Sequence, residues 1–183
     1  MLTRKAVYRD MDVCVNCKAC TVACNVKHMS GSRSGESTLA LPNRNLVNTY
    51  PAGLEIRADR VYQAFISIAC MHCAEAPCIR VCPASAIYKD PEAGITLVDT
   101  EKCIGCRGCL WVCPYGAPTF DGRGKMALCD LCIDRLREGK KTACQHTCPA
   151  RAIFVGSPEE IAEIQAKKAV DRIRNGATIS TVF

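Results

Sequence analysis

Short apolar runs separated by polar turns predict small strands along this chain. The run Val61–Ile68 predicts one strand, and Ala86–Tyr88 with Ile95–Val98 predicts a β-hairpin around a polar turn. The run 150–155 contains the same Ala-Ile-aromatic order as the first strand of that hairpin. Each run lies beside a cysteine-rich loop, so the pattern predicts a repeat of strand, cysteine loop and short helical turn.

One longer helix is predicted near the end of the sequence. Ser157 is a typical N-cap, Pro158 suits the first helical position, and Glu159 and Glu160 suit the first turn. Asn175-Gly176 is the expected stop. The apolar stripe of this helix is expected to pack on its own domain, with a partner surface as the alternative; it comprises Ile161, Ala162, Ala166, Ala169, Val170 and Ile173.

Residues 28–58 interrupt the repeat. The stretch 28–38 is polar and dominated by serine and glycine. A loop of this length in a compact domain is usually either functional or without fixed structure. We therefore predict an insertion that docks a partner, and a mobile loop is the alternative.

Composition changes the picture, because 16 of the 183 residues are cysteines. They fall into four groups of four. The third group has the full C-x2-C-x2-C-x3-C-P spacing; the first shares the spacing without the proline, and the second and fourth each widen one gap. The groups are Cys14, Cys17, Cys20, Cys24; Cys70, Cys73, Cys78, Cys82; Cys103, Cys106, Cys109, Cys113; and Cys129, Cys132, Cys144, Cys148.

Sixteen thiolates supply four ligands to each of four [4Fe–4S] clusters. Three closely spaced cysteines can hold three corners of one cube, and Gly105 and Gly108 let the backbone approach it. The fourth cysteine starts a helical turn that points elsewhere, so it is expected to bind the other cluster of a pair. The proline after it ends that turn. The spacing therefore predicts a carrier of single electrons.

Two other uses of cysteine compete with this interpretation. A disulfide scaffold is disfavoured, because no signal peptide is evident and cysteines three apart are poorly placed to bridge one another. Structural zinc prefers two C-x2-C pairs per ion over a three-plus-one pattern. Zinc in one group, with the fourth as the natural candidate because of its long insertion, stays open as an alternative to a fourth cluster.

The formal net charge of +6 does not indicate nucleic-acid binding, because no run of five basic residues appears. Each oxidised all-cysteine cluster carries about −2, so four clusters bring the loaded protein to about −2. The excess Lys and Arg are then counter-charges. Lys18, Lys102 and Arg107 lie in or beside the ligand loops, where they are expected either to raise cluster potentials or to be solvated surface.

With about 5% aromatic residues the core is small, so the clusters are expected to act as staples and the protein without iron to be unfolded. Free thiolates imply assembly in a reducing compartment. No stretch of 18 apolar residues and no lipidation motif occurs, so membrane contact is expected only through a partner. We expect a cytoplasmic location, with export alongside a signal-bearing partner as the alternative.

The sequence does not predict an active site. Every cysteine is committed as a ligand, and no nucleotide-binding glycine motif is present. His72 and His146 lie inside ligand loops, where hydrogen bonding to sulfur or water is expected rather than acid–base work; His28 lies outside them. Trp111 and Tyr115 are expected to pack around a cluster.

The order and spacing of these motifs resemble the four-cluster iron–sulfur subunit of molybdenum- and tungsten-pterin oxidoreductases of the dimethyl sulfoxide reductase type. The match covers residues 5 to about 156, with 28–58 as its most divergent part. Some relatives replace one cysteine of the third group and hold a trinuclear cluster, but Cys106 is intact here. The matching segments are Ser67–Cys78, Cys103–Pro118, and Cys129–Cys132 followed by Arg135, Glu138–Lys140, Cys144 and Cys148-Pro149.

The resemblance implies an α+β fold of two ferredoxin-like modules, in which clusters draw ligands from across the chain. The outer module would use residues 1–27 and 125–156, the inner module 59–124, with 28–58 inserted and 157–183 as helix and tail. The implied ligand sets are Cys14, Cys17, Cys20 and Cys148 (cluster 1); Cys24, Cys129, Cys132 and Cys144 (cluster 2); Cys70, Cys73, Cys78 and Cys113 (cluster 3); and Cys82, Cys103, Cys106 and Cys109 (cluster 4).

The function implied by the resemblance is a non-catalytic relay. Electrons would pass one at a time through the four clusters, between a large catalytic subunit with a molybdenum or tungsten pterin and a further redox partner. A tungsten aldehyde oxidoreductase-type or benzoyl-coenzyme A reductase-type complex is the alternative partner. A free-standing polyferredoxin that serves several enzymes is the alternative function.

Overall fold

The computed structural model describes residues 4–30, 45–57 and 60–174. Within them the chain forms short helices and strands, and the strands pair into four separate two-stranded antiparallel sheets. This mixture of small strands and short helices confirms the α+β class. No described helix is long and apolar enough to cross a membrane.

The two ends of the chain are joined by a sheet. Strand β1 (Ala6–Arg9) pairs antiparallel with β8 (Ile153–Gly156), with Ala6 opposite Gly156 and Arg9 opposite Ile153. Helix α1 (Ala19–Ser30) packs against α5 (Ala143–Thr147). These pairings, with α4 (Ile133–Arg137) beside them, form what we call the end-paired half, and they confirm the predicted strand near 150–155.

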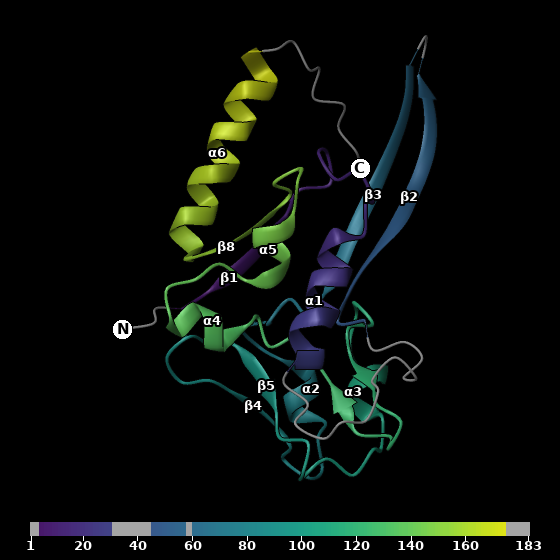
Figure 1. Cartoon of the computed structure of the whole chain (residues 1–183), viewed down its shortest axis with the longest axis vertical. Helices are drawn as coiled ribbons and strands as arrows, with labels where there is room; N and C mark the ends of the chain where they lie inside the picture. Colours follow the sequence, from purple (N-terminus) through teal and green to yellow (C-terminus); the bar gives the residue numbers. More distant parts are fainter. Residues whose placement is uncertain (1–3, 31–44, 58–59, 175–183) are drawn as a thin grey trace.

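The middle of the chain folds against itself, at the bottom of Figure 1. The predicted hairpin is confirmed, because β4 pairs with β5. Helices α2 and α3 contact each other, and each contains the third cysteine of its group. We call this the middle half; its elements are α2 (Pro77–Arg80), β4 (Ile87–Lys89), β5 (Thr96–Val98), α3 (Gly108–Trp111), β6 (Thr119–Phe120) and β7 (Met126–Ala127).

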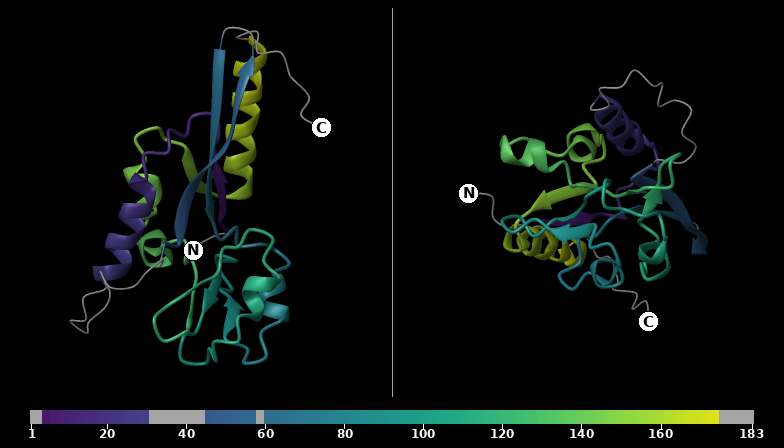
Figure 2. Two further views of the ribbon diagram at one scale, coloured as in Figure 1. Left: turned by 90° about the vertical axis from the view of Figure 1, so that its right-hand side faces the viewer. Right: turned by 90° about the horizontal axis from the view of Figure 1, so that it is seen from below.

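A long hairpin of β2 (Val47–Arg57) and β3 (Arg60–Ala69) rises away from the middle half in both side views (Figures 1 and 2). β3 confirms the predicted strand. The prediction of a loop over 28–58 is wrong for residues 47–57, which form β2. Pro51 and Gly53 disguised the strand, and the structure accommodates them by a shift of register between Pro51 and Leu54. Residues 31–44 lie outside the described residues.

Helix α6 (Pro158–Arg174) begins as predicted. The N–H of Glu160 donates to Ser157 Oγ at 3.2 Å, and the N–H of Ser157 donates back to Glu160 Oε2 at 2.6 Å, which is a capping box. The predicted stop at 175–176 lies outside the described residues. Ile161 is half-buried where α6 meets β1 and β8, but Ile173 is 65% exposed, so the stripe packs on its own domain only at its start.

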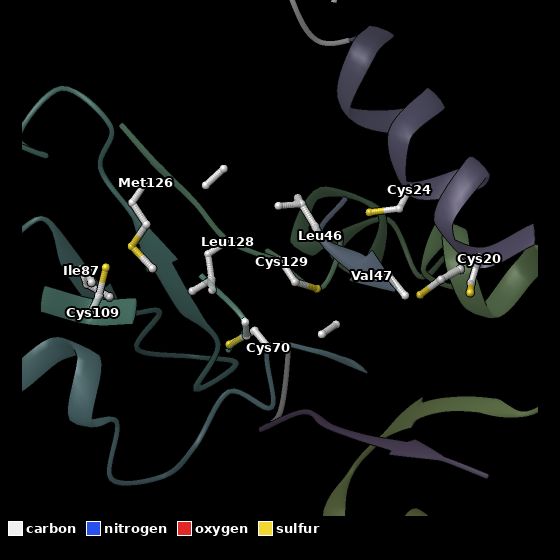
Figure 3. Close-up of a cluster of buried hydrophobic side chains, with 14 of the residues drawn as sticks. Cys20, Cys24, Leu46, Val47, Cys70, Ile87, Cys109, Met126, Leu128 and Cys129 are labelled. Carbon is white, nitrogen blue, oxygen red and sulfur yellow. The ribbon is translucent and has the colours of Figure 1, made fainter. Parts of the chain in front are cut away.

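The cysteines are themselves part of the core. Seven of them are buried in one apolar cluster that runs through both halves, together with Val47, Met126 and Ile153 (Figure 3). A second cluster of Ala93, Ile95 and Leu131 also joins the halves. The seven are Cys20, Cys24, Cys70, Cys103, Cys109, Cys129 and Cys144.

Polar contacts close the same junction between the halves. Arg137 Nη2 in α4 lies 2.9 Å from Asp90 Oδ2, whose side chain is buried in the β4–β5 turn. The N–H of Lys5 donates to Ala93 O at 3.0 Å. The two halves therefore share one core and are not separate domains joined by a linker.

Candidate metal centres

The ligand loops curl tightly, because residues at or beside the cysteines adopt left-handed backbone. The φ angles of Lys18, His72, Arg107 and Cys132 are +61°, +48°, +63° and +49°. At Gly105, with φ of +73°, an added Cβ would meet Gly124 O at 2.8 Å, so only glycine fits. Each loop therefore turns its backbone around the space between its cysteines.

One cavity lies in the end-paired half. It is lined by Cys14, Cys17 and Cys20 from the loop before α1 and its first turn, and by Cys148 from the end of α5. β1 and β3 contribute polar side chains to its wall, and most of the remaining lining is apolar. The structure thus brings together residues more than 120 positions apart in the sequence.

A second cavity lies in the middle half. It is lined by Cys82, which follows α2, and by the three cysteines of the next loop, Cys103, Cys106 and Cys109. Ile87, Phe120 and Met126 provide its apolar wall. Cys106 is exposed, so this cavity lies close to the surface.

The sulfurs of Cys24, Cys129, Cys132 and Cys144 form another set, which is buried between α1, α4 and α5. Burial, together with the neighbouring thiols of Cys144 and Cys132, raises the pKa of Cys24 to about 12. Burial raises the pKa of Cys129 well above its ordinary value, and Cys24 and Cys144 add to this. Thiols that repel one another as thiolates need cationic iron to lose their protons together, so binding iron here releases protons.

The remaining set consists of Cys70, Cys73, Cys78 and Cys113 and lies in the middle half. Burial raises the pKa of Cys70 to about 11; an N–H from His72 opposes this, and Cys78, Cys73 and Cys113 add to it. Lys89 connects this ligand loop to the β4–β5 turn. Its Nζ donates to the carbonyls of His72 and Gly94 at 3.0 and 2.9 Å and also to Cys73 O.

Backbone N–H groups point at cysteine sulfurs in several loops. Such donors stabilise thiolates and cluster sulfurs more than neutral thiols, so their presence fits a bound cluster. In three groups the donor follows a shared sequence pattern, C-P-x-x-A, in which the alanine N–H donates to the sulfur four residues earlier. These are Ala86 to Cys82 at 3.3 Å, Ala117 to Cys113 at 3.5 Å and Ala152 to Cys148 at 3.3 Å; the others are His72 to Cys70 at 3.4 Å, Met126 to Cys103 at 3.3 Å and Ala143 to Cys132 at 3.5 Å.

The repeated alanine was missed in the sequence, although the pattern C-P-x-x-A was visible there. The structure also explains why Asn25 follows Cys24 where the other groups have proline. Cys24 lies inside the long helix α1, which continues to Ser30, and proline would break it. The donor chemistry, the cavities and the N–H groups together fit four [4Fe–4S] clusters.

The other predicted site residues divide clearly. Lys18 Nζ donates to Thr49 O and lines the first cavity, and Arg107 lines the second with its guanidinium 5.5 Å from the Phe120 ring. Lys102 instead pairs with Asp99 at 3.2 Å on the surface. Lys18 and Arg107 therefore line the two cysteine cavities, and Lys102 lies at the surface.

The histidines and aromatics depart from expectation in part. His72 is buried; its Nδ1 accepts the Thr96 N–H at 3.1 Å, and burial, helped by Lys89, lowers its pKa to about 4. His146 is exposed. The prediction that Trp111 and Tyr115 pack around a cluster is wrong, because their side chains are 86% and 48% exposed on the outer side of α3 and the loop after it.

One polar cluster was missed in the sequence. Lys27 Nζ at the end of α1 lies 3.0 Å from Asp134 and 3.7 Å from Asp130, and His28 Nε2 lies 3.5 Å from Asp130. These contacts tie α1 to the insertion between Cys132 and Cys144. The residues are distant in sequence, so no local pattern pointed to the cluster.

Comparison with known proteins shows the family to which this chain belongs. A family model described as "4Fe-4S dicluster domain" matches residues 61–158. The sequence is 39% identical over 171 residues to one subunit of the sulfite dehydrogenase of Allochromatium vinosum, covering 85% of this chain and 69% of that protein. It is 36% identical over 170 residues to one chain of the anaerobic dimethyl sulfoxide reductase of Escherichia coli K12, covering 88% and 77%.

A third relative is longer. The hydrogenase-2 operon protein HybA of Escherichia coli O157:H7 is 34% identical over 175 residues, which cover 87% of this chain but 53% of that protein. The chain thus spans about half the length of HybA.

Proposed function

Because this protein belongs to the 4Fe–4S dicluster family of iron–sulfur electron-transfer subunits and carries four [4Fe–4S] clusters, we propose that it relays electrons between two partners. One partner is a catalytic subunit with a molybdenum or tungsten pterin, and the other is a further redox carrier or subunit. The first two relatives are named as single components of a dehydrogenase and a reductase, which supports assembly with a catalytic subunit.

Each cluster has its own ligand set in this proposal, as the resemblance implied. Clusters 1 and 4 are supported by the cavities that their four cysteines line, and clusters 2 and 3 by the mutual electrostatic effects of their sulfurs. The pairing of β1 with β8 and of α1 with α5 supports an outer module from both chain ends and an inner module from the middle.

The exposure of the cysteines carries the relay proposal. Only Cys17 and Cys106 are exposed among the sixteen, and they belong to clusters 1 and 4. A relay needs two ends near the surface and interior sites between them. In this arrangement the sulfurs of cluster 2 are buried, and those of cluster 3 are buried or half-buried. Cys70 and Cys129 lie in the same core at the junction (Figure 3).

Apolar surface flanks both exposed ends. Within five residues of Cys106 in the sequence, Ile104 is 67% and Trp111 is 86% exposed. Beside Cys17, Val15 is 62% and Val22 is 60% exposed. Exposed apolar groups gathered at a functional edge are typical of interaction sites, so each end offers a surface on which a partner can dock.

The protein's own residues bind and shield the clusters and perform no other chemistry in this proposal. When bound, each cluster accepts and passes on one electron. The cysteines hold the iron, the N–H groups described above stabilise the sulfurs, and the apolar core keeps water from cluster 2. A cytoplasmic location, or export with a signal-bearing partner, completes the proposal.

The test is elemental analysis of the complex purified without oxygen, with subunits identified by mass. We expect about sixteen iron atoms per copy of this chain, and molybdenum or tungsten with a large second subunit. About twelve iron atoms with one zinc would replace one cluster by a structural site. Iron without a partner subunit or pterin metal would instead support a free-standing polyferredoxin.

A further inference from the structure

Arg9 is a charged side chain that the relay has so far left without a role. It is the last residue of β1, held opposite Ile153 by the sheet that joins the chain ends. It lines the first cavity together with Cys14, Cys17, Cys20 and Cys148, so it lies against the proposed position of cluster 1.

The guanidinium of Arg9 is only partly satisfied. Its Nη1 donates to Ser67 Oγ at 3.1 Å, and Ser67 lines the same cavity. Its Nε and Nη2 are buried and have no hydrogen-bond partner among the described residues. A buried charged donor that lacks an acceptor is strongly unfavourable, so these N–H groups are expected to meet an acceptor when the protein is loaded.

The neighbouring oxygens are already engaged. Asp10 pairs with Lys168 and accepts the Asp12 N–H at 3.1 Å. Thr49 donates its hydroxyl to Asn16, and its carbonyl accepts Lys18. Among the side-chain acceptors that line the cavity, the sulfurs of the four cysteines are therefore the natural partners of these N–H groups.

The charge of Arg9 agrees with this choice of acceptor. A guanidinium fixed in the wall of the cavity favours negative charge on the sulfurs that line it. Its planar fork, whose Nη1 is fixed by Ser67, suits it to donate two further N–H groups in a defined direction.

We propose that Arg9 donates its Nε–H and Nη2–H groups to sulfur atoms of the cluster held by Cys14, Cys17, Cys20 and Cys148, and thereby raises the reduction potential of that cluster. Reduction adds one electron, supplied by the redox partner, to a unit that already carries about −2, and a fixed cation stabilises the more negative state. The inference rests on the proposed ligand set for cluster 1.

Lys18 provides an internal comparison. It lines the same cavity, but its Nζ donates to Thr49 O and lies 6.0 Å from the centroid of the Tyr50 ring. It contributes charge without the free fork of Arg9. Loss of Lys18 should therefore shift the potential of this cluster less than loss of Arg9 does.

The experiment is a redox titration of the purified complex, followed by electron paramagnetic resonance. Cys17→Ser identifies the signal of cluster 1, Arg9→Met removes charge and donors, and Arg9→Lys keeps the charge alone. Arg174→Gln, which removes an exposed arginine at the end of α6, is the control. For Arg9→Met we expect at least a tenfold shift of the reduction equilibrium toward the oxidised cluster, which is about 59 mV for one electron.

Further outcomes separate the explanations. Arg9→Lys should fall between the native protein and Arg9→Met, and Arg174→Gln should leave the potential of cluster 1 unchanged. Electron–nuclear double resonance should show exchangeable protons coupled to cluster 1 that disappear in Arg9→Met. An unchanged potential with full iron content, or an equal shift of all four clusters, would overturn the proposal.

Assembly and ligand assignment are controlled separately. If Arg9→Met binds too little iron, Arg9→Lys and Ser67→Ala, which frees Nη1, must still lower the potential of cluster 1, and an unchanged value in both would equally sink the idea. If Cys17→Ser alters none of the four signals, the ligand set of the proposed function fails instead. The two failures are therefore distinguishable.

Discussion

The two most different environments in this molecule are those of the sulfurs of Cys24, Cys129, Cys132 and Cys144 and of the sulfurs of Cys82, Cys103, Cys106 and Cys109. All four members of the first set are buried, with 5 or 6% exposure each. In the second set Cys106 is exposed, and Ile104 and Trp111, which are also exposed, lie within five residues of it in the sequence. We call them the buried set and the surface set.

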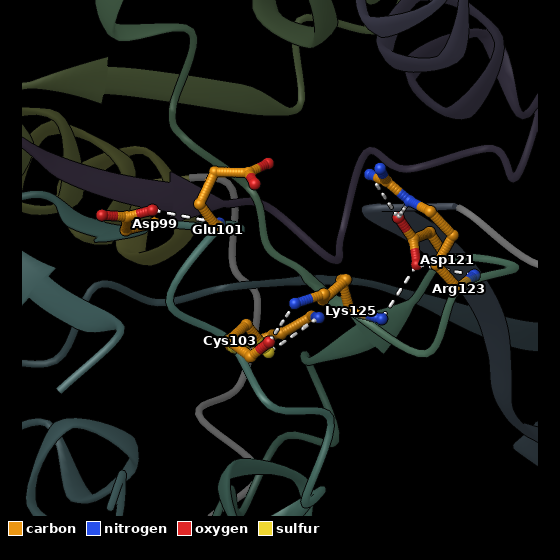
Figure 4. A network of polar contacts seen from close by, with 7 residues as sticks. Asp99, Glu101, Cys103, Asp121, Arg123 and Lys125 are labelled. Carbon is orange, nitrogen blue, oxygen red and sulfur yellow. Dashed lines mark hydrogen bonds and ion pairs between the residues drawn. The ribbon is translucent and has the colours of Figure 1, made fainter. Parts of the chain in front are cut away.

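The surroundings of the two sets differ as much as their exposure. The buried set is enclosed by α1, α4 and α5, and the Lys27–Asp130–Asp134 ion pairs lock the insertion over it. The wall of the surface set is a small hairpin, in which Lys125 Nζ donates to Cys103 O and the Met126 N–H donates to Cys103 Sγ (Figure 4). One sulfur set is thus built to exclude solvent and the other to meet it.

The ligand motifs of the two sets differ as well. The surface set draws three ligands from the most regular motif of the sequence. The buried set draws three from the motif in which eleven residues, and not two, separate the second and third cysteines. The irregular insertion is what buries its sulfurs. Removing iron, ligands or surface groups should affect the two sets unequally.

The largest effect is expected when iron is removed. Chelation under anaerobic, oxidising conditions should abolish most of the helical circular dichroism and the protease resistance, because the core consists largely of cysteine and alanine. Iron should leave in two phases, with the surface set first, since Cys106 is exposed. A single phase, or an iron-free protein that keeps its helical signal, would contradict the contrast.

The next effect concerns single ligands. Cys24→Ala should cost about four iron atoms per chain and expose the α1–α5 region to trypsin, because the buried set cannot admit a replacement ligand. Cys106→Ala should cost about one iron atom and leave protease resistance intact, because a trinuclear cluster can form there. Iron analysis and limited proteolysis of both variants decide this, and equal losses in the two would remove the distinction.

A smaller effect is expected at the surface of the exposed end. Trp111→Ala should weaken binding of the redox partner there by about 2 kcal/mol, roughly 30-fold, because exposed tryptophans are frequent hot spots of interfaces. Iron content and thermal stability should not change. Val170→Ala on α6, where the side chain is 59% exposed but distant from the proposed ends, is the matched control for partner titrations by calorimetry.

Equal weakening by the Trp111 and Val170 variants would mean that the partner does not discriminate between these surfaces. No weakening by Trp111→Ala would place the exit of the relay elsewhere. Either result leaves the ligand sets untouched, because neither side chain lines a cavity described here.

Local patterns predicted much of this fold from the sequence. The hairpin of β4 and β5, the strands β3 and β8 and the start of α6 were all visible, since each depends on residues within a few positions of one another. β2 was missed because Pro51 and Gly53 resemble a loop, and only pairing with β3 shows the strand. Trp111 was misplaced because sequence gives the residue type but not the face of α3 that it occupies.

The candidate site shows the same division. The cysteine spacing predicted four clusters, because that spacing is local chemistry. The positions of the charged residues around the clusters depend on contacts across the fold. Lys89 donates to Cys73 O, Lys125 to Cys103 O and Arg9 to Ser67 Oγ, and these hydrogen bonds join positions up to 58 residues apart. Such contacts leave no periodic signal in a single sequence.

The smallest effect tests how the wall of the surface set is held. Asp121 Oδ1 accepts the N–H groups of Arg123 at 3.0 Å and Lys125 at 2.8 Å, which shapes the turn that delivers Lys125 to Cys103 (Figure 4). Asp121→Ala should lower the free energy of unfolding by about 1 kcal/mol at pH 7. Asp99→Ala, which removes a more exposed cap at Glu101 in the same view, should cost less.

The pH dependence of the Asp121 effect has a definite sign. Burial acts to raise the pKa of Asp121, but the N–H groups of Lys125 and Arg123 outweigh it and lower the pKa below 3.8. A carboxylate with a lowered pKa stabilises the fold fully above its ordinary value and loses this contribution only as the pH falls below it. Denaturant unfolding of native and Asp121→Ala protein should therefore give a constant difference from pH 8 to about pH 5. A difference that already shrinks in this range would mean that Asp121 is not held as a carboxylate by its turn, and that the wall of the surface set depends on Lys125 alone.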